Sequence, residues 1–465
     1  MTVEQQSGHG GPARMAPRAS GSGVPGTGGG VGRQVVTASE ASRDLATQSL
    51  MEVIAERSNL NLAYERVKAN GGAPGVDGMT VDDLKGWCRT HGTELIGQLL
   101  AGSYAPQPVR GKTIPKPGGG ERQLGIPTVV DRLVQQAILQ VLTRLMDPTF
   151  SDHSYGFRPC RSAHQAVRAG AAYVAEGRRI VVDIDLEKFF DRVNHDILMA
   201  RLARHVSDKR LLRIVRRFLE AGMMTEGVCV RREEGTPQGG PLSPLLANLL
   251  LDDLDKELER RGHRFCRYAD DCNIYVQSQA AGERVLASVT AFLEGKLKLR
   301  VNRAKSAVAP AWERKFLGYR LLAGGRLGLA PSSSDRMKDR LRRLTRRNRG
   351  RALEEVVGEI NRFAAGWLGY FRHAECRNWL REVDGWLRQK LRCYRLKQAK
   401  RAKGIAGFLR SCGTPERIAW ATAACSRGWW AKSHTPGAKY AMDLAWFDRL
   451  GLISLVRRHA ALNQP

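Results

Sequence analysis

Two adjacent aspartates between two strand-like runs constrain this chain more than any other feature of its sequence. Strand-forming residues lie on both sides of the acids in the segment Phe265-Cys266-Arg267-Tyr268-Ala269-Asp270-Asp271-Cys272-Asn273-Ile274-Tyr275-Val276. This pattern predicts a β-hairpin whose Asp-Asp turn carries the carboxylates out of the sheet. Carboxylate oxygens are the ligands that Mg²⁺ prefers, and pairs of such ions serve nucleotidyl transfer at its attacking and leaving oxygens. A solvated turn is the alternative, and three further features of the sequence favour the metal site.

A second pair of acids follows a run of β-branched residues, in Ile180-Val181-Val182-Asp183-Ile184-Asp185-Leu186. We expect a strand over residues 180–186, and its period of two places Asp183 and Asp185 on one face, with Ile184 on the other. Acids at a buried strand end are costly unless they are paired or bind a metal. At least one of the two is therefore a candidate metal ligand, and the spacing leaves open which.

Two other segments are candidates for contacts with a nucleotide. The loop Gly235-Thr236-Pro237-Gln238-Gly239-Gly240 is rich in residues that let the backbone approach a ligand closely, and Gln238 adds a side-chain amide. A predicted hairpin around Pro117-Gly118-Gly119-Gly120 carries Lys116 and Arg122, whose cationic groups suit a triphosphate. A plain linker and solvated cations are the respective alternatives.

The charge balance indicates a polyanionic partner. Lys and Arg number 75 against 46 Asp and Glu, which gives a formal net charge of +29. Nucleic acid is the leading candidate and an anionic membrane surface the alternative. No apolar run approaches the roughly 18 residues of a spanning helix, and the start, Met-Thr-Val-Glu-Gln-Gln, does not have the form of a secretory signal. The nine cysteines are scattered without a C-x-x-C pair, as expected for reduced thiols in a cytoplasmic protein that has neither a disulfide framework nor a zinc knuckle.

Composition divides the chain into four parts. Residues 1–41, dominated by Gly, Pro, Ser and Ala between 7 and 33, predict a disordered tail. Residues 42–330 mix helical and strand patterns and predict an α+β core. Residues 331–403 are helical and begin with a basic run that is either a solvated helix face or a phosphate-facing surface. Residues 404–465 interleave cations with aromatic residues, which either form a small core or stack on bases. The basic run comprises Arg336, Lys338, Arg340, Arg342, Arg343, Arg346, Arg347, Arg349 and Arg351.

In this order, the segments resemble those of reverse transcriptases, and specifically of the group II intron reverse transcriptase–maturases. The resemblance covers residues 46–465, nearly everything but the tail. Besides the two acidic segments and the Gln238 loop, it is carried by Ile114-Pro115-Lys116-Pro117-Gly118-Gly119-Gly120, Leu124-Gly125-Ile126-Pro127, Ser154-Tyr155-Gly156-Phe157-Arg158-Pro159, Val301-Asn302-Arg303-Ala304-Lys305-Ser306, Phe316-Leu317-Gly318-Tyr319 and Trp367-Leu368-Gly369-Tyr370-Phe371.

The resemblance implies a right-hand polymerase fold. Fingers and palm would occupy residues 42–330, and an all-α thumb, the maturase domain X, would follow at 331–403. The small basic C-terminal domain at 404–465 is similar to the DNA-binding region of the shorter bacterial class. The paired cysteines of the His-Asn-His endonuclease found in many relatives do not occur here, so we do not expect cleavage of a target strand.

The resemblance also implies roles for individual residues. Asp185, Asp270 and Asp271 would be catalytic and hold two Mg²⁺ ions together with the backbone carbonyl of Leu186, with Asp183 a structural neighbour. Phe190 stands where the family excludes a ribose 2′-hydroxyl. The remaining implied contacts are Lys116, Arg122, Gln238 and Lys305 for the nucleotide, and Phe316, Leu317, Gly318 and Tyr319 for gripping the primer.

The implied activity is magnesium-dependent, RNA-directed DNA polymerisation, combined with binding of the group II intron RNA to assist splicing. Intron mobility by target-primed reverse transcription would add target DNA to the RNA template, DNA primer and dNTPs as partners, and no membrane is expected. Two alternatives stay open: an RNA-binding splicing factor that no longer polymerises, and an intron-free reverse transcriptase of phage defence or a CRISPR locus. The presence of all three acids argues against the first, and domain X against the second.

Overall fold

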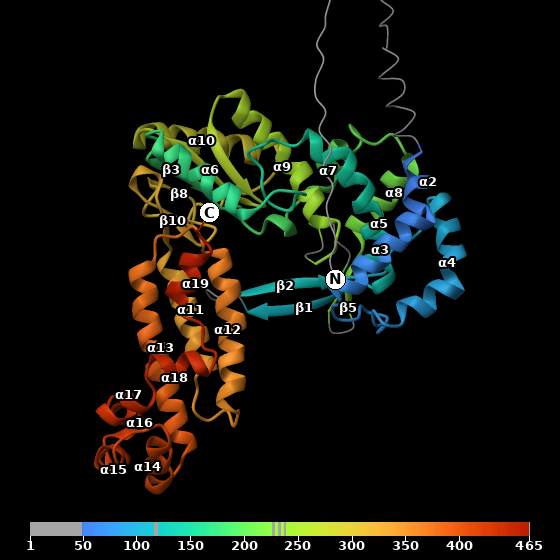
Figure 1. Ribbon diagram of the computed structural model, residues 1–465. Coiled ribbons are helices and arrows are strands. Elements are labelled where there is room, and N and C mark those ends of the chain that lie inside the picture. Colours follow the sequence, from blue (N-terminus) through green and yellow to red (C-terminus); the bar gives the residue numbers. More distant parts are fainter. Residues whose placement is uncertain (1–48, 116–119, 226–227, 231–233, 237–238, 465) are drawn as a thin grey trace, which may run out of the picture. The chain divides into compact units, whose positions relative to one another are not determined.

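The computed structural model describes residues 49–115, 120–225, 228–230, 234–236 and 239–464 (Figure 1). The predicted tail at residues 1–41 lies outside this part of the chain, as do Lys116 and Gln238. No helix of the described part is long and apolar enough to cross a lipid bilayer. Every cysteine whose side chain is described is a free thiol, as the scattered spacing predicts.

An antiparallel sheet of four strands forms the palm, in the order β6-β7-β3-β8. Side chains alternate between its two faces, so Val182 and Ile184 of β3 enter one hydrophobic core while Val181 enters another. Helices α9 and α10 belong to the first core and α6 to the second, which leaves the sheet covered on both faces. The bounds are α6 Ala163–Ala175, β3 Ile180–Ile184, α9 Ser243–Arg260, β6 Arg264–Tyr268, β7 Asp271–Val276, α10 Gln279–Lys296 and β8 Ala307–Pro310.

The fingers consist of a second four-stranded sheet, ordered β2-β1-β4-β5, and of helices on both sides of it in the sequence. Helix α5 is long because apolar side chains recur along its buried face and the Thr128 hydroxyl accepts a hydrogen bond from the Asp131 amide at its start. The bounds are α2 Leu50–Ala55, α3 Arg57–Asn70, α4 Leu84–Leu100, β1 Val109–Pro115, β2 Glu121–Ile126, α5 Val129–Met146, α7 His195–Leu202, α8 Lys209–Glu220, β4 Met223–Thr225 and β5 Val228–Val230. Short 3₁₀ turns occupy Asp147–Thr149 and Phe189–Asp191.

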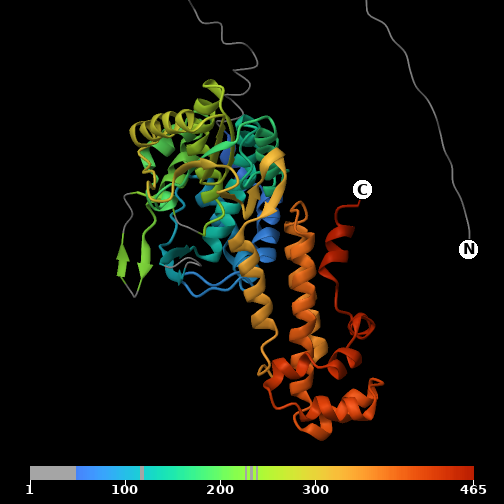
Figure 2. The same ribbon diagram turned by 90° about the vertical axis from the view of Figure 1, so that its left-hand side faces the viewer.

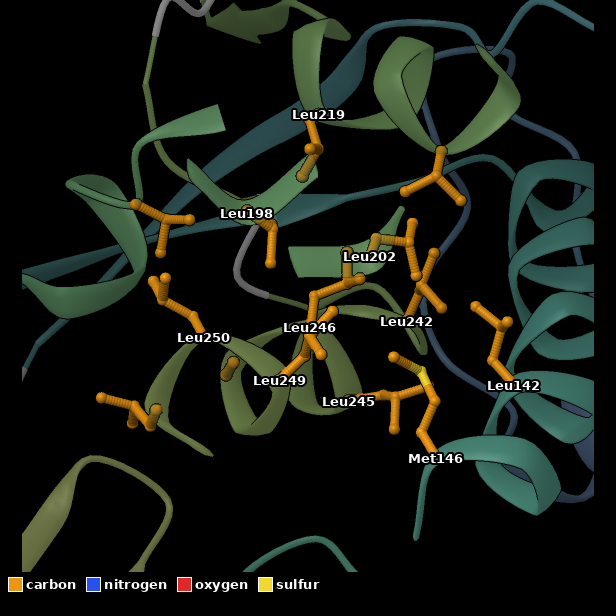
Figure 3. Close-up of a cluster of buried hydrophobic side chains, with 14 of the residues drawn as sticks. Leu142, Met146, Leu198, Leu202, Leu219, Leu242, Leu245, Leu246, Leu249 and Leu250 are labelled. Atoms are coloured by element: carbon orange, nitrogen blue, oxygen red, sulfur yellow. The ribbon is translucent and has the colours of Figure 1, made fainter. Parts of the chain in front are cut away.

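Leucine-rich packing joins the fingers to the first palm face (Figure 3). Each fully buried leucine stabilises the fold by about 1.5–3 kcal/mol, so this cluster fixes how the palm sheet lies against the finger helices. The close-up labels Leu142 and Met146 of α5, Leu198 and Leu202 of α7, Leu219 of α8, and Leu242, Leu245, Leu246, Leu249 and Leu250 at and within α9.

A three-stranded sheet, β11-β10-β9, connects the palm to the three long helices of the thumb. Pro331 occupies the first turn of α11, where its missing N–H is harmless. The second core continues without a break from the palm sheet and α6 through this small sheet into the thumb. The bounds are β9 Lys315–Phe316, β10 Tyr319–Leu321, β11 Leu327–Leu329, α11 Pro331–Leu344, α12 Leu353–Tyr370 and α13 Arg377–Gln398, with a 3₁₀ turn at Ala323–Gly325.

The segment after residue 400 folds back onto the thumb (Figure 2). Its last helix, α19, packs against α12 and α13, and the Asp384 carboxylate of α13 accepts hydrogen bonds from the α19 amides of Leu455 (3.0 Å) and Val456 (3.3 Å). The Asn361 amide of α12 also donates to the Gly451 carbonyl at 2.7 Å. This segment therefore shares the second core with the thumb. The bounds are α14 Ala402–Ser411, α15 Glu416–Ala424, α16 Gly428–Ser433, α17 Pro436–Ala441, α18 Leu444–Arg449 and α19 Leu455–Ala461.

Candidate active site and nucleic-acid interface

The β6–β7 hairpin forms as the sequence predicts, but its turn lies one residue earlier. Tyr268 pairs with Asp271, so the turn consists of Ala269 and Asp270, and Asp271 is the first residue of β7. Ala269 has a φ of 59°, in the left-handed region that residues with a Cβ enter at a cost. Asp270 therefore lies in a strained turn, whereas Asp271 lies at the end of a strand.

Strand pairing brings the second acidic segment to the same end of the sheet. Antiparallel pairing sets Ile184 of β3 opposite Cys272 of β7, so Asp185 follows at the level of Asp271. The strand ends at Ile184 rather than at residue 186, and Leu186 makes an isolated bridge with Val301. Both Asp183 and Asp185 line one cavity, as the period of two predicts.

The two acids of this segment have different partners. Arg314 donates two hydrogen bonds to Asp183 Oδ2, from Nε at 2.9 Å and from Nη2 at 2.6 Å. Among the described residues, the ion-pair partner of Asp185 is Lys305, with Nζ at 3.8 Å from Oδ2, and the Asp185 backbone amide donates to the Ser306 hydroxyl. The Asp183 carboxylate is thus already neutralised by a guanidinium, while Asp185 retains oxygens for another ligand.

Crowding of carboxyl groups perturbs their ionisation. The pKa of Asp271 is raised to about 6, first by desolvation in the cavity wall and then by the nearby carboxylates of Asp270, Asp183 and Asp185. Desolvation also raises the pKa of Asp270, where Asp185 adds to the rise and Arg122 opposes it. Mutual repulsion of this kind in one place is a property of metal and catalytic sites.

The acids stand at one wall of a cavity of about 1170 Å³ between the palm and the thumb, which we call the palm–thumb cavity. Asp183, Asp185 and Asp271 line it from the palm, and Arg336, Trp367 and Tyr370 are among the residues that line it from α11 and α12. Asp183, Asp185 and Asp271 therefore face the open space of the cavity. Within the described part of the chain, no three carboxylate, imidazole or thiol groups are arranged so that they could hold a metal ion by themselves.

The segment implied to grip a primer forms a tight turn at the edge of this cavity. Phe316, Leu317 and Gly318 line the cavity, and Leu317 and Gly318 both have positive φ, 51° and 83°. A Cβ on Gly318 would lie 2.9 Å from the Ser333 hydroxyl, so only glycine fits here. Tyr319 is different: it is fully buried and its hydroxyl donates to the Tyr370 carbonyl.

Two thumb residues hold this turn, and the sequence patterns did not single out either of them for that role. The Ser333 hydroxyl donates to the Gly318 carbonyl at 2.9 Å, and the Tyr370 hydroxyl donates to the Leu317 carbonyl at 2.9 Å. Contacts between residues 15 and 53 positions apart leave no periodic signal in a single sequence. The turn and the thumb are therefore coupled directly.

A buried polar network supports the Ala269–Asp270 turn from behind. Arg267 is inaccessible to water and donates to Asp255 from Nε (2.7 Å) and Nη2 (2.6 Å), while Nη1 donates to the Ala269 carbonyl at 2.9 Å. The same Nη1 donates to Asn248, whose own amide donates to the Gly156 carbonyl at 2.8 Å. A Cβ on Gly156 would lie 2.3 Å from the Ala269 amide nitrogen, so the two backbones touch here. In the sequence, the one feature that points to a special role of Arg267 is a charged residue inside an apolar strand.

The implied nucleotide contacts lie on three elements. Arg122 of β2 is close enough to Asp270 to lower its pKa, so the finger hairpin reaches the Ala269–Asp270 turn. Phe190 is partly buried at the edge of the first core, next to fully buried Phe189, and its carbonyl accepts from the Thr236 amide at 2.6 Å. The described part of the glycine-rich loop is thus anchored beside Phe190. Lys305 lines the palm–thumb cavity next to Asp185, at the ion-pair distance given above.

Carboxylates outside the basic run of the thumb pair with some of its arginines, so its charge is balanced more than its own composition suggests. Besides the Arg342–Asp339 pair, α12 supplies carboxylates to Arg349 (Glu359, 2.7 Å) and to Arg351 (Glu355, 3.4 Å). Acids outside the run therefore neutralise these two arginines, although Asp339 is the only acid within residues 336–351 of the sequence. Within the described residues no carboxylate lies at ion-pair distance from Arg336, Lys338, Arg340, Arg343, Arg346 or Arg347, which supports a phosphate-facing surface.

Two regions of the chain match known families. Residues 114–321 match the family described as reverse transcriptase (RNA-dependent DNA polymerase). Residues 334–413 match the group II intron, maturase-specific domain. The two matched regions correspond to the palm with part of the fingers, and to the thumb with α14.

Individual proteins are similar to parts of this chain. Protein YkfC of Escherichia coli (strain K12) is 32% identical over 331 residues, 62% of this chain and 87% of that protein. The group II intron-encoded protein LtrA of Lactococcus lactis subsp. cremoris is 37% identical over 196 residues, 42% of this chain but only 32% of that protein. A solved structure titled "Partial Cas6-RT-Cas1--Cas2 complex" is 27% identical with a TM-score of 0.35, over 54% of this chain and 43% of that one. With a reverse transcriptase region followed by a maturase-specific domain, and with the right-hand arrangement of fingers, palm and thumb, this chain belongs to the group II intron reverse transcriptase–maturases.

Proposed function

We propose that the chain polymerises DNA on an RNA template with the help of Mg²⁺, and that the chemistry takes place in the palm–thumb cavity. The observation that carries the proposal is the meeting of Asp185 and Asp271 at one wall of a cavity whose other wall is the thumb. A primer–template duplex needs such a space, bounded by catalytic carboxylates on one side and by a surface that holds the strand on the other.

The residues present fit a pair of magnesium ions. Asp185, Asp270 and Asp271 offer oxygen ligands, and bound cations would offset both the desolvation and the mutual repulsion that raise the pKa of Asp270 and Asp271. Mg²⁺ usually takes one or two carboxylates plus substrate phosphates rather than an all-protein cage, which agrees with Asp185 and Asp271 lining a cavity large enough for a substrate. The ions would be held by these three residues and the Leu186 carbonyl, and when bound would activate the attacking oxygen and stabilise the leaving one.

The other residues of the cavity would position the substrates. The turn of Phe316, Leu317 and Gly318 would hold the primer strand, since it lines the cavity and is fixed by two thumb hydroxyls. Arg122 and Lys305 would face the phosphates of a dNTP, because each lies beside one of the catalytic acids. Lys116 and Gln238, outside the described residues, keep the roles implied by the resemblance.

The test is primer extension by the Asp270→Ala variant. Extension should fall by several orders of magnitude while RNA affinity stays near that of the wild type, because the carboxylate serves chemistry and not docking. Asp152→Ala is the matched control, since Asp152 is a solvent-exposed aspartate on the palm side of the chain, with 85% of its side chain accessible. Primer extension by Asp270→Ala at the wild-type rate would refute the assignment of Asp270 as a catalytic residue.

We further propose that the protein binds its own intron RNA, promotes its splicing-competent fold and, with target DNA held by residues 404–465, supports mobility by target-primed reverse transcription. The supporting observations are the maturase-specific match and the unpaired cations along α11. The test is self-splicing at low magnesium, with wild type and with Asp270→Ala. Rescue by the polymerase-dead variant would separate the two activities. A different result would be that neither the wild type nor Asp270→Ala rescues splicing of the correct intron and that neither binds this intron RNA in preference to other RNA. In that case an intron-free reverse transcriptase becomes the better assignment.

A further inference from the structure

A second cavity, of about 600 Å³, lies where the thumb meets the C-terminal segment, and it shares no lining residue with the palm–thumb cavity. We call it the thumb pocket. Its wall is built from the end of α11 and the following loop, from α13, and from α16. On α13, Lys390, Cys393 and Lys397 recur at spacings of three and four residues, so they share one helix face. The volume is in the range of about 300–1,000 Å³ that small-molecule sites have.

The charge of the thumb pocket has one sign. Arg342, Arg346, Arg347, Lys390 and Lys397 line it, and its lining includes neither Asp nor Glu. Only Arg342 has a described carboxylate partner, Asp339 at 2.5 Å. Converging cations without acids repel one another, and this cost is recovered only when an anion enters.

An aromatic ring completes the wall. Trp430 of α16 is 44% exposed, unusually open for a tryptophan, and it lines the thumb pocket. Its helix is fixed to α13, because the Gln389 amide contacts both the Ser433 hydroxyl and, at 3.0 Å, His434 Nδ1. Lys390 Nζ lies 5.4 Å from the centre of the Trp430 ring. An exposed indole held rigidly beside cations is the arrangement with which proteins stack a base and neutralise its phosphates.

We propose that the thumb pocket binds an unpaired nucleotide of single-stranded or bulged nucleic acid, with the base stacked on Trp430 and the flanking phosphates contacted by Arg346 and Lys390. The inference rests on the proposed function only in taking nucleic acid as the partner. It adds a site away from the catalytic acids that selects unpaired over duplex segments, a preference that a purely cationic surface does not have.

The experiment measures binding of the full chain to three fluorescent probes: an oligouridylate, the same strand annealed to oligoadenylate, and the matching oligothymidylate. Trp430→Ala should weaken binding of the single strands by about 5- to 100-fold, the loss expected for one stacked base, and leave the duplex unaffected. Trp430→Phe should restore most of the affinity. Trp420→Ala is the matched control, because Trp420 is 42% exposed in the neighbouring helix α15 but does not line the thumb pocket. Tighter binding of RNA or of DNA would identify intron RNA or a DNA strand as the source of the nucleotide.

Quenching of tryptophan fluorescence by the single strand should be smaller in Trp430→Phe than in Trp420→Phe, since only a stacked indole is quenched by a base. Arg346→Gln should lower the salt dependence of single-strand binding by about 0.7 in log–log slope. The proposal is overturned if Trp430→Ala behaves like Trp420→Ala, or if it weakens duplex and single strand alike. Primer extension by the wild type is scored separately, so an inactive polymerase with a Trp430-dependent single-strand site would refute only the proposed polymerase function.

Discussion

Arg267 supports the Ala269–Asp270 turn from inside the protein, where its own side chain is shielded from water. Its guanidinium is buried and joins Asp255, Asn248 and the Ala269 carbonyl. A planar fork of donors reaches all three at once, which the single ammonium of lysine cannot do. The left-handed Ala269 is therefore held by hydrogen bonds that only arginine supplies, and the position of Asp270 depends on them.

Arg267→Lys should accordingly reduce both stability and turnover. We expect a loss of about 1–3 kcal/mol in the free energy of unfolding, because buried acceptors lose their donors, and a fall in kcat for primer extension with little change in the KM for primer–template. Urea unfolding and steady-state extension measure the two effects. Arg264→Lys, at an exposed position of the same strand, is the control. A variant at position 267 with wild-type stability and wild-type kcat would show that the network does not position the turn.

Two adjacent phenylalanines offer a second test at the scale of residues. Phe189 is buried, whereas Phe190 is only partly buried, and their rings meet at 71° with centroids 5.1 Å apart. We predict that Phe190 crowds the ribose 2′ position of an incoming nucleotide, so Phe190→Ala should raise incorporation of ribonucleotides relative to deoxynucleotides. Competition between the two substrates in one extension assay gives the ratio. An unchanged ratio in a folded variant would reduce Phe190 to a packing role.

Among the elements, the joint between palm and thumb contains a histidine that stays neutral. The pKa of His373 is lowered to about 4, chiefly by burial and in addition by repulsion of the charged form from His164, Arg168 and Arg372. His164 and Arg168 lie on α6, and the Arg372 guanidinium donates to His373 Nε2 at 3.3 Å. Unfolding returns the imidazole to an ordinary pKa near 6.5.

The sign of the pH effect follows from these values. Between about pH 6.5 and pH 4 the unfolded chain binds more protons than the folded one, so the contribution of His373 to stability is present above this window and lost as the pH falls through it. His373→Gln should therefore show a smaller drop in thermal midpoint from pH 7 to pH 5 than the wild type. His91→Gln, at an exposed position of α4, provides the comparison. Equal pH dependence in all three proteins would contradict the assignment of His373.

At this scale the sequence predicts the elements better than their contacts. The hairpin at 265–276, the strand before Asp185 and helix α5 were all predictable, because periodicity and β-branched residues are local signals. The pairing of Asp183 with Arg314 joins residues 131 positions apart, and the spacing of the two acids could not show which one it neutralises. The same holds for the carboxylates that α12 supplies to the basic run. Side-chain partners across elements depend on the packed fold and have no local sequence pattern.

For the whole molecule, the net charge of +29 makes binding of RNA dependent on salt. The logarithm of affinity should fall with that of salt concentration with a slope of about −0.7 to −0.9 per phosphate contact. We predict that Arg340→Gln and Arg343→Gln each reduce the slope by about one contact, because neither has a described carboxylate partner. Arg349→Gln should change it less, since Glu359 already neutralises Arg349. Anisotropy titrations over a salt series measure the slopes, and a larger effect at Arg349 than at Arg340 would refute this account.

The return of α19 to the thumb has a consequence for how the protein is made. Asn361 and Gly451 bond in the folded protein but are 90 residues apart, so the ribosome delivers α12 and α13 long before the helix that covers them. Chains fold from the N-terminal side as they emerge, so fingers and palm can form while the apolar faces of α12 and α13 that α19 covers are still exposed to water. A chain that stopped before α19 would carry Asp185, Asp270 and Asp271 but leave these faces uncovered, and exposed apolar surface of this kind is what chaperones and proteases act on.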